Sequence, residues 1–196
     1  MKKILSLLLV VFMVVCVMAS CGGKNKTEDI IECGSYKVGD YYNDGTKEGI
    51  VFVVYDGGYH GKIVSLDEGK EKWAEYAVWQ NATHATSDGG GMGNMNKIKK
   101  LPNWKSNYPA FAWCASLGEG WYLPAVDELK LIYQNKSIIN RRLNERGYGE
   151  FADYCYWSST EGVDYSDCAW NVYMDGGLTF SVNKDNDRCV RAVSAF

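Results

Sequence analysis

The amino-acid sequence predicts an α+β domain, because strand-like segments flank a central helical region and do not alternate with it. Residues 36–42, 49–55 and 60–66 are short aromatic or β-branched runs, separated by Asn-Asp-Gly and Asp-Gly-Gly turns. This pattern is typical of strands, and the second and third runs read as a hairpin. Residues 154–196 return to short runs broken by Gly, Asn and Asp. We therefore expect two helices packed on small antiparallel sheets.

The helices are predicted from proline positions and from the spacing of apolar side chains. Pro109 and Pro124 each suit the first turn of a helix. Apolar residues recur at helical spacing over 109–117 and again after Pro124, and a further helical piece covers 137–146. We expect a loop over the glycine-rich residues 86–96. Residues 73–82 fit either a short helix or a loop.

The C-terminal segment, residues 154–196, mixes two kinds of side chain. Trp157 and Trp170 stand beside small residues, as buried anchors do, whereas the tyrosines stand among Asp and Asn, as contact residues do. Strand alternation places Leu178, Phe180 and Val182 on one face. That shared apolar face predicts burial of the three side chains.

Composition limits the classes of partner. The formal net charge is -3 and the sequence has no basic stripe, so nothing favours nucleic-acid binding. The chain beyond its first twenty residues is long enough for one domain with its own core.

The first 20 residues have the form of a lipoprotein signal peptide. Lys2-Lys3 precedes an apolar run, Ile4 to Met18, that is too short to span a membrane comfortably. Small residues before Cys21 resemble a bacterial lipobox, which predicts cleavage before Cys21 and a lipid on its sulfur that holds the protein on a membrane. The alternative is an ordinary signal peptide with an incidental cysteine. The polar residues 21–33 predict a flexible tether, and residues 34–196 the domain.

Cysteine usage is compatible with an exported protein. Beyond Cys16 in the signal peptide and Cys21, five cysteines remain, an odd number that leaves at least one unpaired. The compartment permits disulfides. No CxxC pair occurs, which argues against a zinc or thioredoxin-type site.

Catalytic patterns are sparse, and we predict no catalytic residue, no cofactor and no metal centre. His60 and His84 belong to no HExxH motif, and the sequence has no GxSxG elbow. Cys114 lies on the apolar face of its helix, which favours a structural thiol or half-cystine over pairing with His84. Residues 183–187 alternate oxygen ligands like a calcium loop but lack its Gly and closing Glu.

Several motifs together resemble the Lcl C-terminal domain of bacterial surface proteins. They are Gly-Trp-Tyr-Leu-Pro with Asp-Glu-Leu over 120–129, Tyr-Trp-Ser-Ser-Thr-Glu over 156–161 and Val-Arg-Ala-Val over 190–193. The resemblance covers nearly all of residues 34–196 and extends to lipoproteins of Bacteroides-like bacteria. It implies a C-type-lectin-like fold, and it also implies a disulfide between Cys114 and Cys189. The Glu-Pro-Asn type motif of calcium-dependent sugar-binding lectins is absent, so the fold does not imply sugar binding.

The end of the chain is also similar to the variable regions of proteins diversified by retroelements. In such regions Asn codons are scattered into Tyr, Asp, Ser, Gly and Cys. Combined with the chemistry of antibody-like contact surfaces, this similarity gives a predicted ligand-binding set: Tyr154, Tyr156, Asp164, Tyr165, Asp167, Tyr173, Asp175, Asp185 and Asn186. It would expose residues 178 and 180, in conflict with the alternation argument above.

These observations predict a lipoprotein of the outer membrane, placed on the cell surface, that binds a protein or glycan ligand and is not an enzyme. A periplasm-facing placement stays open. The alternatives are an enzyme or enzyme accessory acting on cell-wall or glycan material, and a structural envelope lipoprotein without a specific ligand.

Overall fold

The computed structural model describes residues 35–196, so the predicted signal peptide, Cys21 and the whole predicted tether lie outside the described residues. The described chain forms two sheets and five α-helices, which confirms the α+β class. Small, mostly antiparallel sheets carry the helices in the lectin-like arrangement that was expected, but the helices number five and not two. No helix within residues 35–196 has the length and apolar character needed to cross a membrane.

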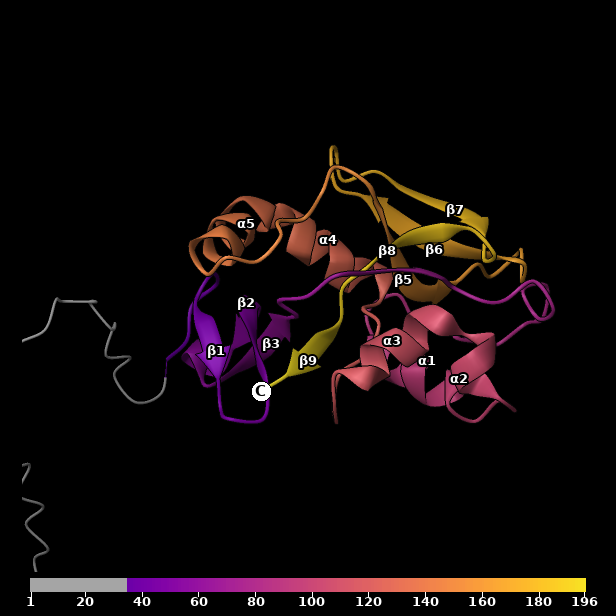
Figure 1. Cartoon of the computed structure of the whole chain (residues 1–196), viewed down its shortest axis with the longest axis horizontal. Coiled ribbons are helices and arrows are strands. Elements are labelled where there is room, and N and C mark those ends of the chain that lie inside the picture. The colour runs from indigo at the N-terminus through magenta and orange to yellow at the C-terminus, as the bar shows by residue number, and fades with distance from the viewer. Residues whose placement is uncertain (1–34) are drawn as a thin grey trace, which may run out of the picture. The chain divides into compact units, whose positions relative to one another are not determined.

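The first sheet joins the two ends of the described chain. Its strand order is β1 (Tyr41–Asn43), β2 (Glu48–Tyr55), β3 (His60–Val64) and β9 (Val193–Ala195), and all its pairs are antiparallel. The predicted hairpin is therefore confirmed, with the 3-10 turn η1 (Asp56–Gly58) between β2 and β3. In Figure 1 the yellow C-terminal strand β9 lies beside β3. Residues 73–82, left open by the sequence, form turns and belong to no helix or strand.

The second sheet carries the C-terminal segment. Its order is β4 (Gly69–Lys72), β8 (Asp187–Val190), β5 (Cys155–Glu161), β6 (Cys168–Tyr173) and β7 (Thr179–Asn183). The strands β5, β6 and β7 form an antiparallel meander, and β8 meets β5 at a single bridge between Cys189 and Tyr156. Leu178, just before β7, and Phe180 on β7 are exposed, so the burial predicted for them from alternation is wrong, whereas Val182 is partly buried against the core.

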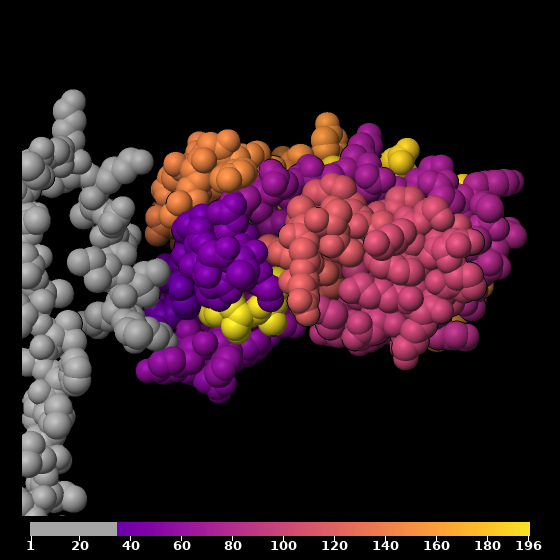
Figure 2. Space-filling view, turned by 60° about the horizontal axis from the view of Figure 1, so that its bottom comes forward, coloured from indigo at the N-terminus to yellow at the C-terminus, as the bar shows by residue number. Residues whose placement is uncertain are grey.

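The helices fall into two groups, as Figure 1 shows. The helices α1 (Gly91–Ile98), α2 (Trp104–Asn107) and α3 (Pro109–Ser116) lie together and form one continuous rose surface in Figure 2. The helix α4 (Val126–Gln134) contacts β2 of the first sheet and β5 and β6 of the second, and α5 (Lys136–Glu145) follows it. The two helices predicted at 109–117 and after Pro124, and the further helical piece predicted at 137–146, are confirmed as α3, α4 and α5.

Helix α1 corrects the loop predicted over residues 86–96. Met95 and Ile98 are fully buried on one face of α1, and Asn94 beside them donates to Ser87 O and Ser159 Oγ. Gly91 lies so close to the Leu123 carbonyl and the Glu128 carboxylate that a Cβ there would clash. The glycine therefore serves close packing, which the sequence alone presents as loop character.

The disulfide predicted between Cys114 and Cys189 is not formed, because both residues are free thiols. Cys114 is buried in the core from α3, and α3 packs on the edge strand β4. Since β4 separates α3 from β8, Cys189 instead interacts with Glu68 and Tyr156.

Candidate ligand-binding cleft

The hairpin of β5 and β6 divides the predicted site into two regions. At its open end Cys155 pairs with Tyr173, and at its other end Glu161 pairs with Ala169. We call the first region the open end, which includes residues 152–155 and 173–175. We call the second the turn end, which comprises the β5–β6 connection, residues 162–167, and the β7–β8 connection, residues 184–186.

The nine predicted contact residues therefore do not form one face. The open end holds three of them, Tyr154, Tyr173 and Asp175, and the Tyr173 hydroxyl donates to Asp175 Oδ2 at 3.4 Å. The turn end holds five: Asp164, Tyr165, Asp167, Asp185 and Asn186.

The ninth, Tyr156, is wrongly placed in the contact set. Its side chain is fully buried, its hydroxyl donates to Glu68 Oε2 and it accepts a hydrogen bond from Ala152 N at 2.9 Å. Burial and the Glu68 carboxylate raise the pKa of Tyr156 well above its ordinary value. Residues two apart share a face only within a strand. Because β5 begins at Cys155, Tyr154 lies outside the strand and does not share a face with Tyr156.

A cleft of about 760 Å³ opens beside the open end. Four short segments meet around it: the start of β4, the chain before β5, the end of β6 and the strand β8. Its lining residues are Glu68, Gly69, Lys70, Ala152, Asp153, Tyr154, Cys155, Tyr173, Asp187, Arg188 and Cys189. Tyr154 is 67% exposed beside it, so a large aromatic surface is free for contact.

Two of the cleft's acidic groups are already bound within the protein. The Glu68 carboxylate accepts from Arg191 Nε at 3.1 Å and from the Tyr156 hydroxyl. Asp153 forms an ion pair with Lys136 at 2.6 Å. Each carboxylate uses only one of its oxygens in these contacts, and the Asp153 side chain is 65% exposed.

Arg188 has the opposite character. Its Nη1 donates to the carbonyl of Asp187 at 2.9 Å, but its Nε is buried and has no hydrogen-bond partner. Among the described residues, neither Arg188 nor the neighbouring Lys70 has a carboxylate within ion-pair distance. A buried donor without an acceptor is costly, and the positive charges of Arg188 and Lys70 stand beside the cleft without an anionic partner.

The thiols near the cleft are not poised as nucleophiles. Burial raises the pKa of Cys155, and burial followed by the Glu68 carboxylate raises the pKa of Cys189 to about 11. Burial also raises the pKa of Cys114 well above its ordinary value. Reactive cysteines need the opposite shift, toward the thiolate.

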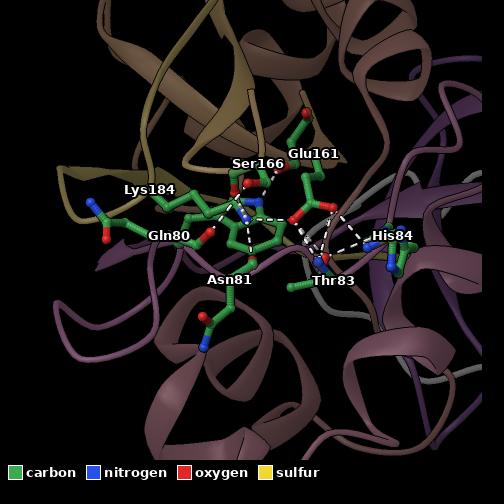
Figure 3. A network of polar contacts seen from close by, with 10 residues as sticks. Gln80, Asn81, Thr83, His84, Glu161, Ser166 and Lys184 are labelled. Carbon is green, nitrogen blue, oxygen red and sulfur yellow. Dashed lines mark hydrogen bonds and ion pairs between the residues drawn. The ribbon is translucent and has the colours of Figure 1, made fainter. Parts of the chain in front are cut away.

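The turn end is built around a buried ion pair, shown in Figure 3. Lys184 is fully buried, and its Nζ donates to the Glu161 carboxylate, to Ser166 O and, at 3.1 Å, to Asn81 O. Burial is the main cause that lowers the pKa of Lys184. The ammonium also lies 4.5 Å from the centre of the Trp73 ring, a favourable cation–π contact.

Glu161 completes this network from the end of β5. Its carboxylate accepts from Thr83 N at 2.8 Å and from His84 N at 2.7 Å. Residues 81–84 and both connections of the turn end are thereby held together. The loop that exposes Asp164 and Tyr165 is therefore fixed by buried groups that all have hydrogen-bond partners. A depression of about 320 Å³ lies beside Asp164.

The calcium-like pattern of residues 183–187 does not gather ligands. Within residues 35–196, no group of three or more His, Cys, Asp or Glu side chains is placed to hold a metal ion.

Sequence reasoning missed Arg188, Lys70 and Lys184. Arg188 and Lys184 occur in a charged segment that is typical of a solvated loop, and Lys70 is far from the C-terminal segment in the chain. Only the pairing of β4 with β8 brings Lys70 to the cleft, through its register with Cys189.

The fold and the cleft define an α+β, lectin-like domain with a cleft walled by tyrosines and an unpaired arginine. Residues 73–194 match the Lcl C-terminal domain, and the chain belongs to the Lcl C-terminal domain family. The crystal structure of a fimbrial protein from Bacteroides ovatus ATCC 8483 shares the fold, with a TM-score of 0.55 and 16% identity. The match covers 69% of this chain and 36% of the fimbrial chain. No curated protein matches the sequence.

Proposed function

We propose that this protein is a surface-anchored lipoprotein whose C-terminal domain binds a protein or glycan ligand in the cleft at the open end. One observation carries the proposal: the cleft combines exposed tyrosine surface with two cations, Arg188 and Lys70, that have no carboxylate within ion-pair distance among residues 35–196. Binding sites commonly combine an aromatic wall with a few polar groups that fix orientation.

Binding without turnover agrees with the chemistry of the cleft. The thiols Cys155 and Cys189 are held in the protonated state, and the carboxylates Glu68 and Asp153 are engaged in internal ion pairs. The fold shared with a fimbrial protein and membership of the Lcl C-terminal domain family support an adhesive role at a cell surface.

The anchor is tested by Cys21→Ala. We expect the variant to leave the membrane fraction or to keep its signal peptide, because the lipid attached to Cys21 is what holds the chain on the membrane. Cell fractionation and intact-mass measurement check this. An unchanged mass and an unchanged distribution would contradict the lipoprotein assignment, and protease treatment of whole cells would separate surface display from a periplasm-facing placement.

The binding site is tested with the full-length protein expressed on bacteria that lack it. Retention of the cells on mucin-coated and fibronectin-coated surfaces is compared between wild type and the double variant Tyr154→Ala/Tyr173→Ala. The matched control is Tyr59→Ala/Tyr76→Ala, which also removes exposed tyrosine area but away from the cleft. We expect the cleft variant alone to reduce retention. Equal retention of both variants would reject the cleft as the binding site.

A further inference from the structure

We propose that the helices α1–α3 form a membrane-docking surface, and that its partner is the anionic headgroup layer of a phospholipid bilayer. The inference goes beyond the proposed function, because it concerns another part of the domain and needs neither the cleft nor a lipid at Cys21. Three observations lead to it: a local excess of unpaired lysines, apolar side chains interleaved with them, and the position of the helices relative to the cleft.

The helical segment 89–118 differs in charge from the rest of the chain. It contains four lysines and no Asp, Glu or Arg, whereas the whole chain has a formal net charge of -3. The four lysines are all exposed and close together in the sequence: Lys97, Lys99, Lys100 and Lys105. Such a cluster produces a local positive potential on a protein that is acidic overall.

These lysines are not neutralised within the domain. Among residues 35–196, none of the four forms an ion pair, whereas five of the other eight lysines do. Lys97 donates to a backbone carbonyl, and Lys105 lies 5.8 Å from the centre of an indole ring. The carboxylate of Glu75, beside the end of α2, is balanced by Lys72 at 3.1 Å. An external anionic partner therefore meets four uncompensated positive charges.

Apolar side chains are interleaved with the lysines where α1 passes into α2. Residues 99–105 read Lys-Lys-Leu-Pro-Asn-Trp-Lys, in which Pro102 is exposed and Leu101 and Trp104 are partly exposed. Segments that lie in a membrane interface combine lysines with Leu and Trp in this way, and Trp is favoured at the level of the headgroups. A soluble polyanion would meet the lysines but leave the apolar side chains in water.

The choice of lysine also favours a bilayer over a single defined anionic group. Arginine presents a planar fork that matches one phosphate, whereas lysine is a point charge. Because the segment 89–118 has no arginine, its attraction depends on the density of negative charge and not on a fixed geometry. An anionic leaflet supplies such diffuse charge, and each lysine near it strengthens binding about fivefold.

Docking through α1–α3 leaves the candidate cleft free. In Figure 1 these helices lie at the lower right, whereas the orange chain that leads into β5, part of which lines the cleft, rises to the top. Figure 2 shows α1–α3 as one continuous face of the domain. A domain held by this face therefore keeps the cleft away from the bilayer.

The experiment uses the predicted mature chain, from residue 21, with Cys21→Ser so that no lipid contributes. Sedimentation measures binding to vesicles of phosphatidylcholine alone and to vesicles with about 30% phosphatidylglycerol. We expect binding to the anionic vesicles, binding at least about tenfold weaker to the neutral ones, and weakening as salt is raised. Equal binding to the two vesicles, or binding to neither, would overturn the inference.

A pair of matched variants locates the surface. Lys99→Gln/Lys105→Gln should weaken binding to the anionic vesicles about 25-fold, because two lysines near the leaflet are lost. The control Lys37→Gln/Arg141→Gln removes the same charge from two other exposed positions and should leave binding within about twofold of wild type. Thermal melting confirms that both variants are folded. Equal weakening in both would assign binding to net charge and reject the helical surface.

Contact with the acyl region is measured by the quenching of tryptophan fluorescence in anionic vesicles that carry brominated acyl chains. Trp104→Phe removes one fluorophore and keeps an aromatic ring. The quenched fraction should be larger in the wild type than in this variant, because Trp104 lies in the segment proposed to enter the interface. Equal quenched fractions would overturn the inference.

Heparin tests the soluble alternative. A chain that binds heparin but no vesicle would reject the bilayer as the partner. The inference and the proposed function fail separately: vesicle binding can be absent while the cleft variant still abolishes cell retention, and retention can be unaffected by the cleft variant while the vesicles still bind.

Discussion

The two ends of the β5–β6 hairpin use charge in opposite ways. At the turn end, Lys184 and Glu161 are buried and every donor finds an acceptor, so the ion pair fixes three segments of chain. At the open end, Arg188 is half-buried and its Nε has no acceptor within the protein. The charged groups of the turn end hold segments of the scaffold together, whereas Arg188 has no carboxylate partner among the described residues.

The motifs that resemble the Lcl C-terminal domain belong to the scaffold. Glu128 of the Asp-Glu-Leu segment is buried and accepts from Lys62 at 2.6 Å, from the Tyr122 hydroxyl and from Ala125 N. Arg191 of the Val-Arg-Ala-Val segment binds Glu68 and the carbonyls of residues 65 and 66. Such buried polar groups hold loops in place, and neither Glu128 nor Arg191 lines the cleft at the open end.

The largest expected effect is a loss of stability at the turn end. Lys184→Ala leaves the Glu161 carboxylate buried without its cation, and we expect a loss of about 3–5 kcal/mol in the free energy of unfolding, measured with urea. Lys130→Ala removes an exposed ion pair with Asp127 and should cost at most about 1 kcal/mol. Similar losses in the two variants would remove the distinction between buried and exposed pairs.

The second prediction concerns pH and the thiol of Cys189. Its folded-state pKa is raised from 9.0 to about 11, first by burial. The unfolded chain releases this proton near pH 9, so the stability contributed by the neutral thiol is complete below pH 9 and is lost as pH rises through about 11. We expect this loss to reach about 2–3 kcal/mol.

Urea midpoints recorded between pH 8 and 11 check the Cys189 prediction. Cys189→Ala should flatten the alkaline decline, because the variant has no thiol to ionise at that position. Cys168→Ala, a half-buried thiol on β6, serves as the control and should keep most of the decline. An alkaline decline that is identical in wild type and Cys189→Ala would assign it to other groups.

The third prediction compares neighbouring tyrosines. Tyr156→Phe removes a hydroxyl that binds Glu68 and Ala152 N, and the loss of these two part-buried hydrogen bonds should cost about 1–3 kcal/mol. Tyr154→Phe removes a hydroxyl for which no hydrogen bond is formed among the described residues, and the stability should not change measurably. Calorimetric melting of the two variants measures this difference. If Tyr156→Phe is as stable as the wild type, water replaces the lost hydroxyl.

Much of the fold could be predicted from local pattern. Proline positions and apolar spacing located the helices beginning at Pro109 and after Pro124, and turn residues located the β2–β3 hairpin. Helix α1 was not predicted, because Gly91 is required for close packing against Glu128, a residue far along the chain. Local signals cannot report such contacts.

The candidate site was predictable only in part. Tyr154 and Tyr173 were identified as contact residues, and they do line one cleft. The sequence could not distinguish the buried Tyr156 from these two contact residues, because its burial depends on contacts with Phe151 and Glu68. Lys184 and Arg188 occur in the same charged segment, yet one is buried and the other faces the cleft. That difference is set by Glu161, a partner from another strand.

The smallest expected change in stability, and the sharpest test of the two ends, comes from single exposed tyrosines. Tyr154 at the open end and Tyr165 at the turn end are each 67% exposed, and Tyr59 on the β2–β3 hairpin is 65% exposed. Each Tyr→Ala change should stay within about 0.5 kcal/mol of wild-type stability, because none of the three side chains is part of the core.

Binding should then separate the three variants. If the cleft is the site, Tyr154→Ala weakens ligand capture by an amount typical of a contact hot spot, about 2 kcal/mol or more, while Tyr165→Ala and Tyr59→Ala do not. Cell retention measured beside thermal melting gives both quantities for each variant. If Tyr165→Ala alone lowers retention, the fixed loop at the turn end is the contact surface, as the similarity to diversified variable regions predicts for residues 164–167. The unsaturated Arg188 would then need another explanation.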